Sequence, residues 1–251
     1  MDIVVLTALG VGGATLIGAL IGFCFKEISH KFSDIVLGFA AGVMLAAAVI
    51  GLIMPSMENG GKYAVFISIV AIFVGAFVLN LIDKFVPHLH KMAGIDSESH
   101  NISSNKFNKV LLFVMAIAIH NFPEGIAAGV GFGTGNNSEA LTIAGGIALQ
   151  NIPEGMVIIA PMLAAGVSKK RTLLIASFTG IIEVIGTFIG YFAVSISEAL
   201  LPFALAFAGG TMLYIISDEM IPQTHSHGFE RGATYSLIAG FCLMLLVDFY
   251  L

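Results

Sequence analysis

Eight long apolar stretches leave this chain of 251 residues few ways to fold. A helix that crosses a lipid bilayer needs roughly 20 predominantly apolar residues. The stretches that meet this requirement are 2–25, 34–54, 63–85, 107–131, 138–165, 170–195, 199–221 and 231–250. Only 11% of the residues are charged, whereas a soluble domain typically carries about 25%. The sequence therefore predicts an all-α polytopic membrane protein with eight transmembrane helices, whose solvent is the lipid bilayer.

The connections between these stretches are short and polar, and the longest runs from about 86 to 106. No second domain is expected, so residues 1–251 form one eight-span unit. The first stretch has no basic residues before it and reaches Phe25, which favours a retained span over a signal peptide. The net charge of −5 gives no basic face for nucleic acid. Cys24 and Cys242 lie in apolar stretches and are expected to be small buried hydrophobic residues.

Lysine and arginine placement predicts the orientation, because cytoplasmic connections are enriched in these residues. With the N-terminus outside, the cytoplasmic connections hold ten of the 11 basic residues and leave Lys62 alone outside. This bias supports an even number of spans with both termini outside. Compact loops and the absence of a targeting segment favour a bacterial plasma membrane.

Two internal repeats connect spans that run in opposite directions. His120–Gly125 (HNFPEG) in the fourth span matches Gln150–Gly155 (QNIPEG) in the fifth. Phe39–Leu45 in the second span resembles Phe207–Leu213 in the seventh, and a proline follows each. Inverted repeats are typical of secondary transporters, whose sites lie near the midplane of the membrane. The repeats therefore predict a carrier with a site at mid-depth.

Three carboxylates, Glu124, Glu154 and Glu183, lie well inside apolar spans. A charge at the centre of a bilayer costs about 2.5–3.5 kcal/mol even on the most lenient scale. No lysine or arginine lies at this depth to pair with them. Protons or a bound metal ion must therefore neutralise them.

Helical spacing places His120 above Glu124 and Gln150 above Glu154, because residues four apart share a helix face. An asparagine adjoins the first residue of each pair. Imidazole and carboxylate together suit a borderline divalent ion such as Zn²⁺, Fe²⁺ or Mn²⁺. A metal-free proton relay, or a polar cluster that only holds the helices together, stays open at this point.

These residues resemble the ZIP (Zrt/Irt-like protein) family of divalent metal transporters, over essentially the whole chain. The paired His-Asn-x-Pro-Glu-Gly motifs are specific to that family, and Gln150 at the start of the second copy resembles the GufA-type bacterial branch. The resemblance implies a homodimer that transports Zn²⁺ as substrate and uses no cofactor. Since a neutral amide replaces an imidazole at Gln150, Fe²⁺, Mn²⁺ and Cd²⁺ are further candidate substrates.

The resemblance also implies a binuclear site. The first metal ion would be held by Met44, His120, Glu124, Gln150 and Glu154. The second would be held by Asn121, Glu124, Asn151, Glu154 and Glu183, so that Glu124 and Glu154 bridge the two ions.

Further polar residues are candidates for the transport path. Glu58 lies where it would attract cations at the outer entrance, and the segment that holds Asp218, Glu219 and His225 resembles the family's exit region. Four histidines of the predicted cytoplasmic connections are candidates for metal capture: His88, His90, His100 and His227.

Alternating access of a metal ion to a mid-membrane site is the interpretation that these features favour. The alternative is an intramembrane metal-dependent hydrolase, but such enzymes usually keep three firm protein ligands and a base. Here the sequence has one intramembrane histidine, no His-Glu-x-x-His motif and no serine nucleophile beside it. A metal sensor or a structural subunit is disfavoured because no connection is large enough to form a signalling domain.

Overall fold

The structure is a computed structural model that describes residues 2–25, 29–59, 61–85, 104–164 and 166–250. Within these residues it is built from helices and contains no strand. The long helices are α1 (Asp2–Gly22), α2 (His30–Ala46), α4 (Ala64–Phe85), α5 (Ser104–Gly131), α6 (Asn137–Ala164), α7 (Lys169–Ile196), α8 (Leu201–Ile215) and α10 (Glu230–Tyr250). Short elements extend or join them: η1 (Ala47–Ile53), α3 (Met54–Asn59), η2 (Gly61–Tyr63), η4 (Phe132–Thr134), η5 (Glu198–Leu200), η6 (Ile216–Met220) and α9 (Ile221–Thr224).

The predicted membrane fold is confirmed. Seven helical segments of the described residues are long and apolar enough to cross a membrane. The remaining predicted span, the fourth (107–131), lies within α5, which is 28 residues long. Most boundaries agree within a few residues, but the second segment is a longer helix than predicted and runs over His30–Asn59. Most of the predicted connection at 86–106 lies outside the described residues.

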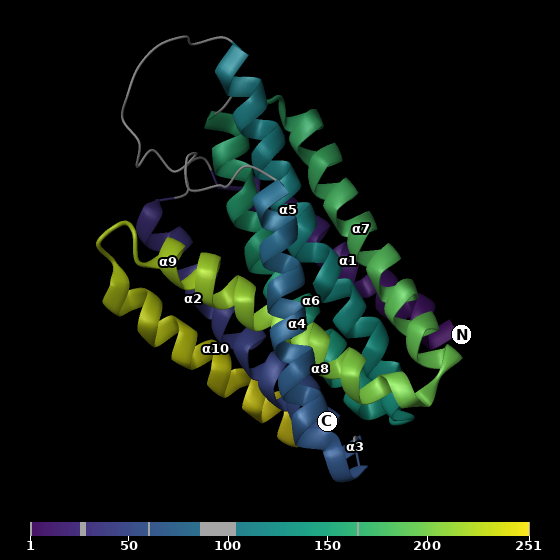
Figure 1. The fold of residues 1–251 in the computed structure, drawn as a ribbon. Coiled ribbons are helices and arrows are strands. Elements are labelled where there is room, and N and C mark those ends of the chain that lie inside the picture. The colour runs from purple at the N-terminus through teal and green to yellow at the C-terminus, as the bar shows by residue number, and fades with distance from the viewer. Residues whose placement is uncertain (1, 26–28, 60, 86–103, 165, 251) are drawn as a thin grey trace.

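The long helices form two bundles (Figure 1). In the first bundle, α1 packs against α6 and α7, and α5 packs against α7. In the second, α2 packs against α10, and α4 packs against α8. The bundles meet where α2 contacts α6 and where α5 contacts α8. Both chain ends lie away from the end of the molecule that holds α9 and the start of α5 (Figure 1), as an even number of spans requires.

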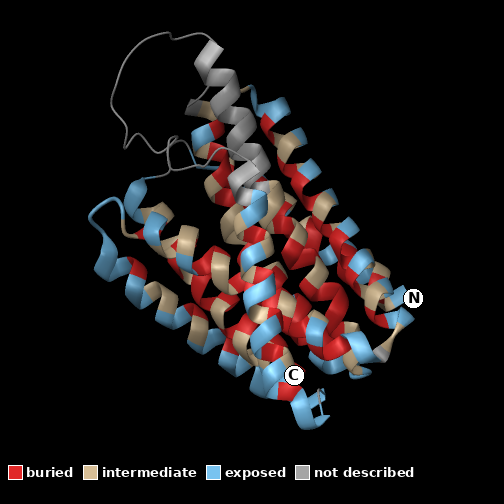
Figure 2. Ribbon diagram, in the orientation of Figure 1, coloured by how far each residue is buried: buried red, intermediate tan, exposed pale blue. Residues whose placement is uncertain are grey.

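Burial separates an inner surface from an outer, apolar one. Buried residues face the helix contacts in both bundles, and exposed residues line the outer sides (Figure 2). Many of the exposed residues are large and apolar, such as Phe66, Phe73 and Phe77 on α4. The expectation that Cys24 and Cys242 are buried is wrong, because both are exposed. An apolar stretch in a membrane helix need not face the protein, since lipid is equally apolar.

Glycines set how closely the helices of the first bundle approach. A Cβ atom added at Gly125 would collide with the backbone carbonyl of Glu183, and one at Gly155 with that of Thr15. The same holds for further glycines at helix contacts: Gly18, Gly22, Gly186 and Gly190. Small residues at such crossings allow close packing in membranes, where apolar burial gives no driving force between helices.

The substitution Gly125→Ala is therefore expected to lower the thermal stability of the protein. Overpacking typically costs about 1–3 kcal/mol, and here the obstacle is backbone, which cannot rotate away. Gly145→Ala on α6 is the matched control, because a Cβ atom added at Gly145 would meet nothing within 4 Å. Thermal unfolding in detergent measures both variants. Equal unfolding temperatures for the two variants would contradict this account of the α5–α7 contact.

The repeat that relates Phe39–Leu45 to Phe207–Leu213 is accompanied by a similar distortion of both helices. After the matching segments in α2 and α8, each helix passes into a π-helical turn, η1 and η6 respectively. Pro55 and Pro222 lie just beyond these turns. A proline removes one backbone donor and clashes with the carbonyl four residues earlier, and a π turn relieves such a conflict by widening the helix. The inverted pair of spans therefore shares a local distortion as well as a sequence.

Candidate metal site

Three neighbouring helices of the first bundle carry the seven predicted ligands that lie outside the second span. His120, Asn121 and Glu124 are on α5; Gln150, Asn151 and Glu154 are on α6; and Glu183 is on α7. Five of these side chains are almost completely buried, with relative exposures of 0–1%: Asn121, Glu124, Gln150, Asn151 and Glu183. His120 and Glu154 are half-buried.

Helix packing brings the α5 and α7 parts of this residue set next to each other. Both α5 and α6 continue as helices through the prolines of their motifs, Pro123 and Pro153. The residue after Glu124 is Gly125, which packs on the backbone of Glu183 itself. The fourth and sixth predicted spans thus meet at their acids.

One direct contact links two of the predicted ligands. The Nδ2 atom of Asn151 donates to Oε1 of Glu183 at 2.5 Å and lies 3.2 Å from the backbone oxygen of Val11 on α1. Because both partners of this amide nitrogen are fixed by helices, the Asn151 carbonyl oxygen is held in a defined orientation. That oxygen has no hydrogen-bond partner among the described residues.

Unpartnered polar atoms concentrate at this site. Ten buried side-chain nitrogen and oxygen atoms of the described residues lack a hydrogen-bond partner, and eight belong to the five deeply buried ligands named above. Both carboxylate oxygens of Glu124 and one of Glu183 are among them. Buried polar atoms in native proteins are almost always paired, and six of these eight are oxygens. The donor set therefore fits a cation.

The acids are close enough for their charges to interact. Glu124 interacts electrostatically with both Glu154 and Glu183, and Glu154 also with His120. No lysine or arginine among the described side chains contributes to these interactions. Carboxylates that repel each other in a dry environment must be neutralised, either by protons or by a positive charge between them.

His120 has a partner that crosses between the bundles. Its Nε2 atom lies 2.7 Å from Oε2 of Glu219, which belongs to the π turn η6 of the second bundle. π turns occur frequently at functional sites. The contact joins a predicted ligand to a predicted path residue, a pairing that sequence spacing alone does not reveal.

The predicted ligands are not drawn together around a single point. No three His, Cys, Asp or Glu side chains in the described part of the chain lie close enough together to hold a metal ion. An ion bound here would need the acids to close in on it, or amide oxygens to complete its shell. Met44 is fully buried on α2, which packs against α6. Its place in the core is established, and its role as a ligand stays a prediction.

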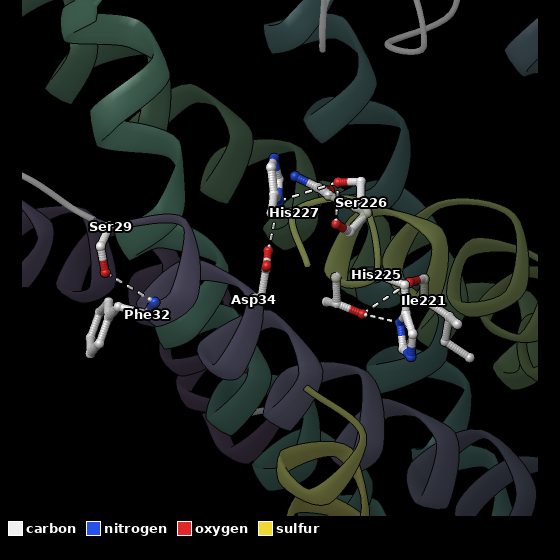
Figure 3. Close-up of polar contacts among 9 residues, drawn as sticks. Ser29, Phe32, Asp34, Ile221, His225, Ser226 and His227 are labelled. Atoms are coloured by element: carbon white, nitrogen blue, oxygen red, sulfur yellow. Dashed lines mark hydrogen bonds and ion pairs between the residues drawn. The ribbon is translucent and has the colours of Figure 1, made fainter. Parts of the chain in front are cut away.

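The other path residues differ in their surroundings. Glu58 is exposed on α3, and Asp218 is half-buried in η6. His225 is engaged at the end of α9. Its Nδ1 atom is 2.8 Å from the Ile221 carbonyl oxygen (Figure 3). Its Nε2 atom is 3.3 Å from Thr234 Oγ1. These contacts give His225 a structural role in joining α9 to α10. His88, His90 and His100 lie outside the described residues.

Thr15 is a site residue that sequence reasoning missed. Its hydroxyl group is buried and lies beside the Glu183 carboxylate. The sequence gives little indication of this role, because threonine is common in apolar helices and carries no charge. The first span thus contributes an oxygen to the site.

Comparison with known proteins identifies the family. Residues 94–248 match the family described as "ZIP Zinc transporter". The chain is 40% identical over 243 residues to a protein of Myxococcus xanthus named "Zinc transporter GufA", with 94% of each chain covered. The chain belongs to the ZIP family. The ZIP resemblance deduced from the motifs, including its GufA-type branch, is therefore confirmed.

Other ZIP relatives cover most of this chain as well. "Zinc transporter ZIPB" of Bordetella bronchiseptica is 36% identical, over 94% of this chain and 77% of its own length. "Zinc transporter ZupT" of Chlorobaculum parvum is 37% identical, over 93% and 91% respectively. Membership of the ZIP family makes the chain a membrane transporter rather than an enzyme, which removes the hydrolase alternative.

Proposed function

We propose that this ZIP protein transports divalent metal ions, above all Zn²⁺, into the cytoplasm through the cluster on α5, α6 and α7. The observation that carries the proposal is the set of buried, unpartnered oxygens on residues of the two repeated motifs. The names of the relatives supply the metal, since each is called a zinc transporter. Fe²⁺, Mn²⁺ and Cd²⁺ are proposed as further substrates because Gln150 offers a weaker ligand than histidine.

Charge balance explains why the cluster selects a divalent ion. Two carboxylates cancel the charge of one such ion, so the filled site is close to neutral in a medium that penalises net charge. With Glu124 and Glu154 as bridges, the remaining ligands divide into two sets. His120, Gln150 and Met44 would complete the first site, and Asn121, Asn151 and Glu183 the second. The Asn151–Glu183 hydrogen bond supports the second set, because it already holds two of its members together.

The division into two bundles supports alternating access. All proposed ligands except Met44 belong to the first bundle, whereas Met44 and Glu219 belong to the second. A shift of one bundle relative to the other would change which end of the site is open. An ion leaving His120 would meet Glu219, which lies within hydrogen-bonding distance of the same nitrogen atom. The membrane potential would favour inward movement by about 2.3 kcal/mol per charge per 100 mV.

The proposal also includes the location and assembly of the protein. The distribution of lysine and arginine supports a plasma membrane protein with both termini outside. A homodimer is proposed from the family resemblance. The exposed apolar side chains on α4 and α10 are available to lipid or to a second copy.

Zinc uptake by proteoliposomes tests the proposed function. We expect vesicles containing the unsubstituted protein to accumulate Zn²⁺, and vesicles containing Glu154→Ala to lose nearly all of this uptake. Glu139→Ala on the same helix is the control, because Glu139 is exposed and bonds only to Asn136 among the described contacts. Uptake that persists in Glu154→Ala, or is absent from the unsubstituted protein, would refute the proposal.

The identity of residue 150 is expected to set metal preference. Gln150→His adds an imidazole ligand, which suits Zn²⁺ better than an amide oxygen does. We expect this variant to favour Zn²⁺ over Mn²⁺ about tenfold more strongly than the unsubstituted protein. Competition uptake with Zn²⁺, Fe²⁺, Mn²⁺ and Cd²⁺ measures the preference. An unchanged order of preference would show that Gln150 is not a ligand.

A further inference from the structure

A cavity of about 300 Å³ lies between the start of α2 and the start of α10, apart from the cluster on α5, α6 and α7. Residues of both helices and of the turn before α10 line it: Lys31, Gly228, Phe229, Glu230, Arg231 and Gly232. All of these residues are exposed. The cavity is therefore open to whatever surrounds this end of the second bundle.

Contacts between α2 and the α10 region hold the two walls of the cavity in place. The Ser236 hydroxyl group on α10 donates to the Ile35 carbonyl oxygen on α2 at 2.6 Å. In the turn before α10, Nδ1 of His227 lies 3.0 Å from Oδ1 of Asp34 on α2 (Figure 3). Asp34 is 1% exposed, so its side chain has a fixed place in the packing. Because both walls are anchored, the cavity is preformed, as binding sites for small groups usually are.

The length of α10 sets the depth of this cavity in the membrane. The membrane span runs over Glu230–Tyr250 and has 21 residues. At 1.5 Å per residue it is about 31 Å long, which matches the hydrocarbon core of a bilayer. Its first residues therefore lie at the level of the lipid headgroups. Phe229 and Tyr235 are exposed beside the cavity, by 39% and 74%, and such aromatic residues are enriched at this level.

Positive charge predominates in the cavity although the whole chain has a net charge of −5. Lys31 and Arg231 are cationic, and Glu230 is the one acid among the lining residues. Among the described residues, neither base forms an ion pair. A guanidinium group matches the geometry of a phosphate and binds it through two parallel hydrogen bonds. Basic pockets at the ends of membrane helices suit anionic lipid headgroups for this reason.

An apolar surface continues from the cavity along α10. Starting at Arg231, exposed residues recur every three or four positions, which places them on one face of the helix. These residues are Tyr235, Ile238, Cys242, Leu245 and Phe249. A ligand with a charged head and long apolar chains would match both parts of this surface at once.

We propose that an anionic phospholipid binds at the junction of α2 and α10. Its phosphate group lies between Lys31 and Arg231 in the cavity, and its acyl chains lie along the exposed face of α10. The bound lipid thus connects the first turns of the two helices. The site depends on the membrane fold of the chain and is independent of the acids proposed to carry the metal ion.

Native mass spectrometry of the purified full-length protein tests the proposal, with phosphatidylglycerol and phosphatidylcholine of identical acyl chains. We expect the unsubstituted protein to retain phosphatidylglycerol preferentially. A basic side chain near an anionic membrane surface contributes about fivefold to binding, so Lys31→Gln/Arg231→Gln should lower this preference about 20-fold. Lys169→Gln/Lys170→Gln is the matched control. It removes the same charge from exposed residues at the start of α7, a span that begins on the same side as α10.

Equal losses in the two double variants would show a general attraction of basic residues to anionic lipid and would overturn the proposed site. An unchanged preference in Lys31→Gln/Arg231→Gln would do the same. Inorganic phosphate should not displace phosphatidylglycerol; displacement would assign the cavity to free phosphate instead. Thermal unfolding gives a second readout. Phosphatidylglycerol should raise the unfolding temperature of the unsubstituted protein relative to phosphatidylcholine, and this difference should disappear in Lys31→Gln/Arg231→Gln.

Discussion

Replacing Glu124 by glutamine is expected to abolish the stabilisation of the folded protein by zinc. Glu124 has no exposed surface, and neither of its carboxylate oxygens has a hydrogen-bond partner among the described residues, so a bound ion would supply a partner for both. A ligand at about 1,000 times its dissociation constant adds about 4 kcal/mol of stability. At about 2–4 °C per kcal/mol for domains of 150–250 residues, the unfolding temperature rises by roughly 10 °C. The variant should show no rise.

Measuring the unfolding temperature both in chelator and in excess zinc separates the effect of zinc binding from the effect of the substitution itself. In chelator, Glu124→Gln should unfold at or above the temperature of the unsubstituted protein, because the amide removes a buried charge without changing the shape of the side chain. Glu139→Gln is the matched control, since its acid is exposed on α6. It should keep the full response to zinc. A zinc-dependent rise that survives in Glu124→Gln would place the ion elsewhere.

Replacing Glu219 by glutamine is expected to slow zinc uptake about tenfold while leaving the zinc affinity of the central site within about threefold. The reason is the 2.7 Å contact between Glu219 Oε2 and His120 Nε2. A hydrogen bond to a charged group is worth about 1.5–3 kcal/mol, and a neutral amide makes a weaker hydrogen bond and is a weaker metal ligand than a carboxylate. Uptake by proteoliposomes gives the rate, and equilibrium dialysis gives the affinity.

The variant Asp218→Asn distinguishes the effect of losing the Glu219–His120 contact from the effect of losing one negative charge in η6. Asp218 is the preceding residue of the same π turn and is also half-buried. A smaller loss of uptake in Asp218→Asn than in Glu219→Gln would support a direct step between His120 and Glu219. Equal losses would instead attribute the effect to negative charge at this end of α8, and an unchanged rate in Glu219→Gln would remove this residue from the path.

Most of the fold could be predicted from the sequence because the bilayer restricts the alternatives. A helix is the simplest way to satisfy the backbone groups of an apolar stretch in lipid, so the length of each stretch predicts a span. The side that faces lipid could not be predicted in the same way, as the exposed Cys242 on α10 shows. In a soluble protein an apolar face is a buried face, whereas here both faces of a helix can be apolar. The π turns were likewise unpredicted, because they depend on how a proline is accommodated.

The sequence predicts those residues of the candidate site whose burial in lipid costs free energy and whose spacing places them on one helix face. Glu124, Glu154 and Glu183 stood out because a charge at mid-depth needs a reason, and the structure brings them close together. Thr15 was not identified from the sequence, because placing a hydroxyl group in a membrane helix costs little free energy. The His120–Glu219 contact joins residues 99 positions apart in sequence, on different bundles. Only the three-dimensional packing of α5 against α8 reveals it.

The π turn before Pro222 fixes which side of its helix bears Glu219. A hydrogen-bonded π turn encloses one residue more than an α turn does. Without that extra residue, the part of the helix that follows the insertion, including Glu219 near the end of the turn, would rotate by about 100° about the helix axis and move by about 1.5 Å along it. Glu219 would then point away from His120. The rotational position of this helix segment thus determines whether Glu219 of the second bundle contacts His120 of the first bundle.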